Sequence, residues 1–455
     1  MVRIVRRAWA VTVVALVLPV AMLAQGRRAA PVTVFDNARL ILGDGSAPVE
    51  QGRLVVQGGR ILAVGARTAV AVPPGAVRVD LTGRTVMPTL VNAHVHIGYE
   101  GYTSWAAENY TAANVLDHLQ REAYYGVGVT QSVGSSPTEA AIAFVRDQQA
   151  GRFPAASRFL FMPGMAPPHG GPDAILIKAT DQLKVVYEVS TGAEARAAVQ
   201  GMAARGLTSV KIWVDDRRGT YPKMTPEVYN AVIDEAHRHQ MLVHAHAIQM
   251  ADQKAVIRAG ADVLVHMVQN EPLDDELLGL LREKRPYWVT VLGLGDRSEA
   301  CNGDAFVDAT YPPSALERIR HEDCAPLPPT AINRERTLLN NMPLYIRNGA
   351  RLVLGTDAGI DVRHAFGWAD HHELSRWVGL GVSPAEAIVA ATSRPAALLG
   401  LTDLGTLAAG KRASFLVLSA NPLDDISNTR RIQQVYLDGV RLAREPLAAS
   451  FRAKH

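Results

Sequence analysis

The feature that most constrains the fold is a regular alternation of short apolar runs and longer helical segments between residues 87 and 404. The helical segments include PEVYNAVIDEAHRHQ and MADQKAVIRAGA, the second of which ends at Gly260, where a helix C-cap is expected. Strands that alternate with helices build βα units around a parallel sheet, so this region predicts an α/β fold, a (β/α)8 TIM barrel. The predicted strands are LVNAHVH, GVTQSVG, RFLFMPG, SVKIWV, MLVHAHA, DVLVHMV, YWVTVLG and RLVLGTDAG.

The two flanks of this region have a different pattern. Residues 25–86 contain short β-branched runs between turn residues, as in GRLVVQGGRILAVG, and residues 405–455 return to this pattern in KRASFLVLSA and IQQVYLDGVRL. We therefore predict accessory β structure in residues 25–86 and 405–455, beside a barrel domain of residues 87–404. The pattern alone does not show that these two segments meet in one domain.

The N-terminus has the pattern of a targeting segment. Arginines within the first seven residues precede an unbroken apolar run at residues 8–20, and small residues follow at Ala21 and Ala24. The run is short for a membrane span, so residues 1–24 predict a signal peptide, a secreted or periplasmic protein, and no stable membrane insertion after cleavage. An uncleaved anchor is the alternative.

Charge and cysteine content narrow the function further. The chain has 47 basic and 44 acidic residues, a balance that does not favour nucleic acid as a partner. Its two cysteines, Cys301 and Cys324, bracket a polar segment, and the sequence leaves open whether they form a disulfide or remain free thiols. Neither C-x-x-C zinc spacing nor a G-x-S-x-G nucleophile motif occurs in the sequence.

Metal-competent side chains occur at the ends of several predicted strands. His94 and His96 end the first strand, His246 the fifth, His266 the sixth and Asp357 the eighth. In a parallel barrel all strands point the same way, so side chains late in their strands converge at one face. Each motif alone has a structural alternative, such as a core histidine or a helix cap, but together they predict a metal centre. An aspartate there can bind a metal and also carry protons.

Two further polar residues lie inside apolar strands. Lys211 occupies the fourth strand, where an unpaired ammonium is costly, so it is expected to be modified, to reach solvent, or to pair with Asp215 or Asp216. His244 shares a strand face with His246 but lies deeper, so we expect it to support the ligands or to belong to the core.

The chain resembles the amidohydrolase superfamily, and within it the branch of imidazolonepropionase-like proteins and metal-dependent Xaa-Pro and Xaa-Arg dipeptidases. The resemblance runs from VMPTLVNAHVH through VKIWV, HAHA, LVHM and LGTDAG to SPAEAIVAATSRPAALLGLTDLGTLAAGKRASFLVL. It implies that both chain ends form one β-sandwich. It also implies two divalent ions, usually zinc, with a carboxylated and bridging Lys211, held by His94, His96, Lys211, His246, His266 and Asp357. A metal-bridging hydroxide would then attack the substrate.

Some positions depart from the family pattern. Asn92 stands where the family commonly has aspartate before H-x-H, and we expect it to orient ligands rather than to bind metal. His169 resembles a substrate-loop histidine of the branch, with a solvated loop residue as the alternative, and Tyr221 and Arg363 are weaker candidates for binding a substrate carboxylate.

These inferences predict a binuclear metal-dependent amidohydrolase that cleaves an amide bond in a small molecule such as a dipeptide or an N-acyl amino acid. Members of the branch also cleave bulky amides such as mycotoxin conjugates. Hydrolysis of a cyclic amide, lactone or carbamate is the nearest alternative. From another functional class, a non-catalytic periplasmic binding protein on the same fold is the competing hypothesis. The sequence leaves homo-oligomer formation open.

Overall fold

A computed structural model describes residues 30–172, 174–296, 301–321, 324 and 326–454. The predicted signal peptide, residues 1–24, lies outside the described residues. Within the described ranges, no helix is both long and apolar enough to cross a bilayer.

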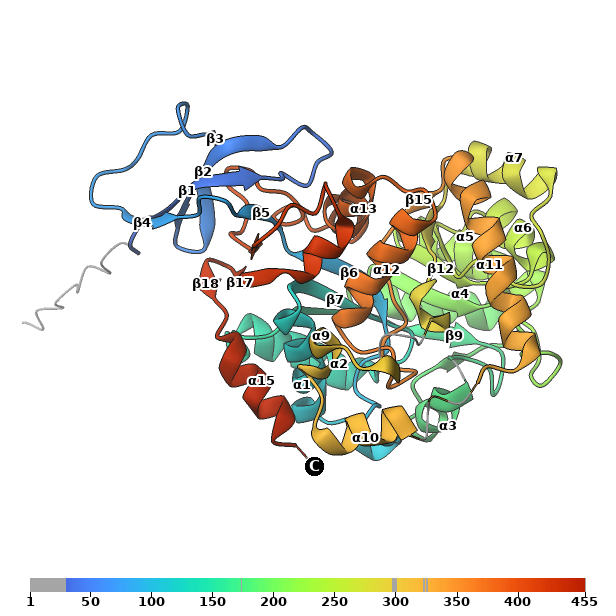
Figure 1. The fold of residues 1–455 in the computed structure, drawn as a ribbon. Coiled ribbons are helices and arrows are strands. Elements are labelled where there is room, and N and C mark those ends of the chain that lie inside the picture. The colour runs from blue at the N-terminus through green and yellow to red at the C-terminus, as the bar shows by residue number, and fades with distance from the viewer. Residues whose placement is uncertain (1–29, 173, 297–300, 322–323, 325, 455) are drawn as a thin grey trace, which may run out of the picture.

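Both chain ends contribute to one eight-stranded sheet, drawn in blue and red beside the larger domain in Figure 1. The two ends join where β16 pairs antiparallel with β5. The ring of Phe35 from the N-terminal part packs edge-on against Phe415 and Tyr436 from the C-terminal part. The strands are β1 (Thr33–Leu40), β2 (Val49–Gln57), β3 (Arg60–Ala66), β4 (Val77–Asp80), β5 (Thr85–Pro88), β16 (Phe415–Leu418), β17 (Ile432–Leu437) and β18 (Val440–Arg441).

The expected β-sandwich is not confirmed. The accessory strands follow the single path β18-β17-β16-β5-β1-β2-β3, with β4 paired to β1, so they form one sheet among the described residues rather than two facing sheets. The chain does not remain in this sheet to its end. Its last helix, α15 (Arg444–Arg452), packs against α1 (Ala112–Tyr124) of the larger domain, where Arg444 donates to the carbonyl of Tyr124.

Each of the eight predicted barrel runs contains a strand. The third run is split in two by Pro163, and one short strand, β10, was not predicted. Turns and helices separate these strands along the chain, as expected for βα units. The strands are β6 (Leu90–Val95), β7 (Val127–Val133), β8 (Arg158–Met162), β9 (Gly164–Ala166), β10 (Tyr187–Glu188), β11 (Ser209–Trp213), β12 (Leu242–His246), β13 (Val263–Val265), β14 (Tyr287–Val289) and β15 (Arg351–Leu352).

The expectation of a closed barrel is corrected, because these strands form two parallel sheets, β6-β7-β8 and β10-β9-β11-β12-β13-β14-β15. Pro163, between β8 and β9, has no N–H to continue the ladder. On the other side β15 is only two residues long, and the chain after it meets β6 through isolated contacts, including the bonds from Ala93 N to Leu354 O and from His96 N to Ala358 O. The strands of the two sheets therefore lie in a nearly circular arrangement, but their backbone pairing is interrupted between the sheets.

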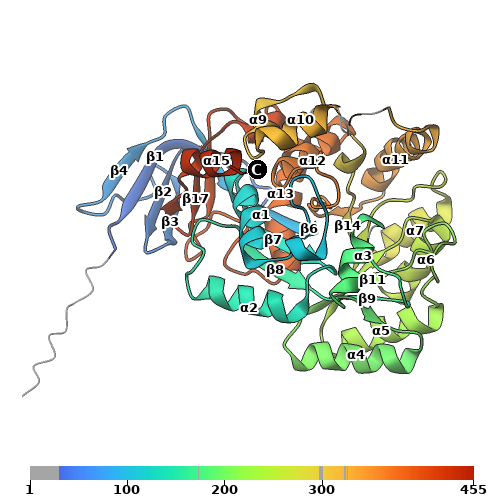
Figure 2. The same cartoon turned by 90° about the horizontal axis from the view of Figure 1, so that it is seen from below.

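Helices surround these strands in Figures 1 and 2. Both helical segments singled out in the sequence form helices, and Gly260 caps the second with a positive φ of 101°. The helices are α1, α2 (Thr138–Gln149), α3 (Ala174–Gln182), α4 (Gly192–Ala204), α5 (Pro226–Arg238), α6 (Met250–Ala259), α7 (Asp275–Lys284), α9 (Ala305–Asp308), α10 (Pro313–His321), α11 (Pro329–Arg347), α12 (Trp368–Gly379), α13 (Pro384–Ala391), α14 (Ser393–Leu398) and α15, with 3-10 turns η1 (Ala107–Asn109), η2 (Gly293–Gly295) and η3 (Ile426–Arg430).

A long connection between β14 and β15 contains η2, α9, α10 and α11. Within it Cys301 and Cys324 form a disulfide, with their Cα atoms 5.7 Å apart. Val307 and Tyr311 of this connection pack with Val95 and Phe366, close to the end of the first barrel strand. The connection is therefore part of the wall around the strand ends.

Candidate active site

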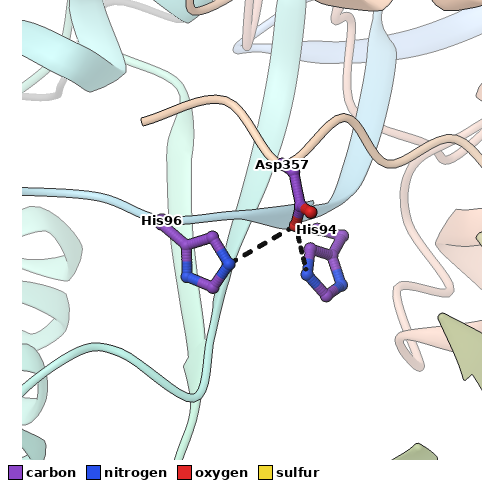
Figure 3. A group of neighbouring side chains, drawn as sticks. All are labelled: His94, His96 and Asp357. Carbon is purple, nitrogen blue, oxygen red and sulfur yellow. Dashed lines mark ion pairs between the residues drawn. The ribbon is translucent and has the colours of Figure 1, made fainter. Parts of the chain in front are cut away.

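Three of the predicted ligands form a compact buried group (Figure 3). The Nε2 atom of His94 lies 2.8 Å from Oδ1 of Asp357, and the Nε2 atom of His96 lies 3.4 Å from the same oxygen. Their side chains are almost inaccessible to solvent. The two histidines share a face at the end of β6 because side chains two apart on a strand point the same way. Asp357 adopts a left-handed φ of 59°, in the segment that follows β15.

His266 extends this group. It follows β13 with a left-handed φ of 68°, and its Nε2 atom lies 3.6 Å from Oδ2 of Asp357. The ring of His246, at the end of β12, packs edge-on against that of His266 with centroids 4.6 Å apart. Nε2 of His246 lies 3.0 Å from Oδ2 of Asp215. Strands β6, β12 and β13 and the segment after β15 thus bring these side chains to one place.

Lys211 and His244 lie beside this group on neighbouring strands. In the β11–β12 pairing Lys211 is in register with His244, and Trp213 with His246, so all four belong to the same alternating set of positions. Lys211 and His244 are both buried. The ring nitrogens of His244 have no hydrogen-bond partner among the described residues. Burial, followed by the charge of Lys211, lowers the pKa of His244 to about 3.

The electrostatics favour neutral imidazoles around an ionised carboxylate. Burial, and then the charge of Lys211, holds the pKa of His94 well below its usual value. Burial also lowers the pKa of His246 to about 3. Burial alone would raise the pKa of Asp357, but the imidazoles that face it outweigh this effect and hold its pKa well below the ordinary range. Neutral histidines and an ionised aspartate are the protonation states that bind metal ions.

The arrangement of these atoms fits a metal centre. Among the described residues, neither carboxylate oxygen of Asp357 accepts a well-aligned hydrogen bond, although imidazole nitrogens lie within 4 Å of both. A fully buried carboxylate without hydrogen bonds calls for another partner, and one ligand atom from each of His94, His96 and Asp357 lies within 4.8 Å of the other two. Nitrogen and oxygen donors that converge in this way suit zinc and similar divalent ions.

Asn92 connects two parts of the group. Its side-chain Nδ2 donates to Oγ1 of Thr356 at 3.0 Å, and its Oδ1 accepts from the backbone N of His94 at 3.0 Å. Asn92 therefore ties the strand that carries the H-x-H motif to the segment that carries Asp357.

A cavity of about 630 Å³ opens over these side chains. Its lining includes three of the predicted metal ligands, His246, His266 and Asp357, and also Asp215. Sequence reasoning treated Asp215 only as a partner for Lys211, because no local pattern reveals its contact with His246, 31 residues further along the chain. The cavity is large enough for a small molecule.

The three predicted substrate-binding residues, His169, Tyr221 and Arg363, are not part of the lining of this cavity. His169 and Tyr221 line a second cavity, of about 390 Å³, whose lining shares no residue with that of the first. Arg363 binds the carboxylate of Asp361, with its Nε atom 2.7 Å from Oδ1 and its Nη2 atom 2.6 Å from Oδ2. The structure thus does not place these three residues beside the predicted metal ligands that line the first cavity.

Fold and site together define a barrel-type α/β protein with a candidate metal centre at the carboxyl ends of its strands. The sequence matches the amidohydrolase family over residues 85–442. The chain belongs to this family.

Individual relatives support the branch that the sequence resembles. Ochratoxinase from Aspergillus niger is 28% identical over 244 residues, which are 51% of this chain and 45% of that protein. Imidazolonepropionase from Deinococcus radiodurans is 36% identical over 100 residues, 21% of this chain and 25% of that protein. The matched regions thus span less than half the length of these curated relatives. The crystal structure of a candidate prolidase from Bifidobacterium longum superposes with a TM-score of 0.70 at 26% identity, covering 93% of this chain and all of that one.

Proposed function

We propose that the protein is a binuclear metal-dependent hydrolase that cleaves an amide bond of a small molecule, such as a dipeptide or an N-acyl amino acid. One observation carries the proposal. The buried carboxylate of Asp357 lies within 4 Å of three imidazoles, at the end of the strands and beside a cavity that opens to solvent.

The chemistry of the donors supports a pair of metal ions. The residues that would hold them are His94, His96, Lys211, His246, His266 and Asp357. Bound there, two divalent ions would lower the pKa of a water molecule and polarise the scissile carbonyl. Lys211 would bridge the two ions as a carbamate. The carbamate would also be an acceptor for the buried ring of His244, which is in register with Lys211 and has no hydrogen-bond partner among the described residues.

Asp357 has the properties of the proton carrier. Its carboxylate is ionised, buried and part of the cavity lining, so it can accept a proton from the attacking water. The same carboxyl group can then donate that proton to the leaving nitrogen, since both events occur within one small volume. Asn92 holds the backbone of His94 and the side chain of Thr356 in place during this transfer.

The cavity also supports a substrate with a carboxylate. Arg218 and Arg334 both belong to its lining, one after β11 and the other on α11. Guanidinium groups bind carboxylates in bidentate fashion. This supports dipeptides and N-acyl amino acids over uncharged amides. The predicted residues His169, Tyr221 and Arg363 remain a second hypothesis for this contact.

A hydrolysis screen on metal-loaded protein tests the proposal. The protein is stripped with a chelator, reloaded with zinc or manganese, and assayed against dipeptides, N-acyl amino acids, lactones and carbamates. We expect amide hydrolysis that disappears on chelation and returns with metal. Faster hydrolysis of lactones or carbamates would favour the alternative substrates, and tight binding without turnover would favour a binding protein.

We also propose that the protein is exported. The N-terminal pattern supports this, and so does the Cys301–Cys324 disulfide, since disulfides persist in oxidising compartments. Fractionation of cells that produce the full chain, followed by N-terminal sequencing, tests this proposal. Recovery of uncleaved protein in the cytoplasm would contradict it.

A further inference from the structure

The turn that follows β14 contains a valine in an unfavourable backbone conformation. Val291 has a φ of 56°, in the left-handed region, and only 5% of its surface is exposed. A β-branched side chain is a rare occupant of this region because its Cβ substituents collide with the backbone. Such a conformation persists only where the surroundings impose it, and it is found most often at functional sites.

The surroundings of Val291 impose the conformation through Glu373 of α12. One oxygen of this buried carboxylate accepts bonds from Oγ1 of Thr290 and from the backbone N of Leu292, the latter at 3.0 Å. The other oxygen accepts from the backbone N of Gly293 at 2.7 Å. Glu373 therefore holds the chain on both sides of Val291.

Gly293 allows the turn to approach α12 this closely. A Cβ atom at this position would lie 2.9 Å from Cδ2 of His372 and 3.1 Å from Cε1 of His364. The first distance is shorter than real Cβ contacts, and both histidine rings are buried. The turn is thus fixed by a carboxylate on one side and by close packing on the other.

In this conformation Val291 belongs to a buried cluster with Val263 and Val289 and also to the wall of the active-site cavity. Val291 lines the cavity together with His266 and Asp357 of the candidate metal centre. Leu294, three residues later, and Leu338 of α11 also line it. Apolar side chains from the β14 turn and from α11 thus face the same cavity as the catalytic carboxylate.

We propose that Val291 is a specificity-determining residue, whose strained conformation presents an apolar surface to a substituent next to the scissile amide bond. This inference rests on the proposed function. It names the substrate class more closely: a small amide with a carboxylate and with an apolar group on the acyl or the amine side. Val291, Leu294 and Leu338 form the contact surface for the apolar group.

Variants of Val291 test the inference in two independent ways. V291F fills the cavity and V291A enlarges it, and both are assayed with N-acyl amino acids and dipeptides whose apolar groups increase in size. We expect V291F to lower the ratio of kcat/KM for the largest group to that for the smallest by about tenfold or more. V291A should shift the ratio in the opposite direction. Both variants should keep the metal content of the wild type.

The strain is measured separately, because V291G removes the Cβ collision. We expect V291G to have a higher Tm than V291A, because glycine alone enters the left-handed region without a Cβ collision and the two variants lose nearly the same packing. R285G is the matched control, since Arg285 also has a left-handed φ, 47°, but caps α7 and does not line the cavity. R285G should raise Tm without altering the substrate ratio.

The outcomes separate this inference from the proposed function. If the metal-loaded wild type hydrolyses no amide of the series, the proposed function fails. If the wild type hydrolyses them and the ratio is the same in V291F and V291A, the inference fails and the proposed function stands. If V291G is less stable than V291A, the conformation of Val291 is not strained and that part of the inference is wrong.

Discussion

Replacement of Asp357 by asparagine tests its proposed role as proton carrier, because the amide keeps the shape of the side chain but cannot accept the proton. In the structure this carboxylate lies 2.8 Å from His94 and 3.4 Å from His96, fully buried. A positioned general acid–base contributes about 10²–10⁴ in rate. Since D357N also removes an anionic donor, we expect kcat to fall by about 10³–10⁴, which corresponds to about 4–5.5 kcal/mol in the activation barrier.

The assay has to separate proton transfer from metal loss. Steady-state kinetics on the best amide substrate are therefore paired with the metal-to-protein ratio and with circular dichroism of each variant. D234N is the control, since Asp234 lies on the outer surface of α5, 3.3 Å from Arg196. We expect D234N to behave as the wild type. If D357N keeps its metal and retains kcat within about tenfold of the wild type, Asp357 is not the proton carrier.

Two further predictions concern stability. Burial lowers the pKa of His371 to about 4. The ring of His371 forms hydrogen bonds with the hydroxyl of Thr429 and with the carbonyl of Tyr125. In the unfolded chain His371 takes up a proton near pH 6.5, whereas in the folded chain it stays neutral down to about pH 4. The contribution of His371 to the free energy of unfolding should therefore fall by roughly 3 kcal/mol as the pH drops from 6.5 to 4. H371Q should flatten this slope in denaturant titrations, and parallel curves for both proteins would refute the assignment. The disulfide closes a loop with a sequence separation of 23, so the C301S/C324S double variant should lose about 3 kcal/mol of unfolding free energy. An unchanged denaturation midpoint would contradict this.

The strands and the positions of the candidate ligands were predictable because both depend on local periodicity. Short apolar runs that end in His94, His96, His246, His266 and Asp357 carry their own strand pattern, and parallel strands must bring their ends to one face. The structure gathers these side chains as that rule requires. The family resemblance implied that both chain ends meet, and they do, but in one sheet rather than in the expected β-sandwich.

The details that were not predictable depend on contacts distant in the sequence. Glu373 fixes the turn at Val291 across about 80 residues, and no pattern near either residue announces it. Continuity of the barrel likewise depends on backbone pairing at Pro163 and after β15, whereas hydrophobic alternation predicts only that strands exist. Resemblance and side-chain chemistry suggest His169 and Tyr221 as substrate-binding residues. The cavity that they line depends on the path of their loops, which the local sequence does not determine.

We propose that side chains from separate strands hold two cations at one point, and anomalous diffraction can locate such cations. Crystals of protein loaded with zinc would be measured on both sides of the zinc absorption edge. We expect two adjacent peaks in the anomalous difference map, bounded by His94, His96, Lys211, His246, His266 and Asp357. A fully loaded crystal with zinc bound elsewhere, or with no peak between these six side chains, would contradict it.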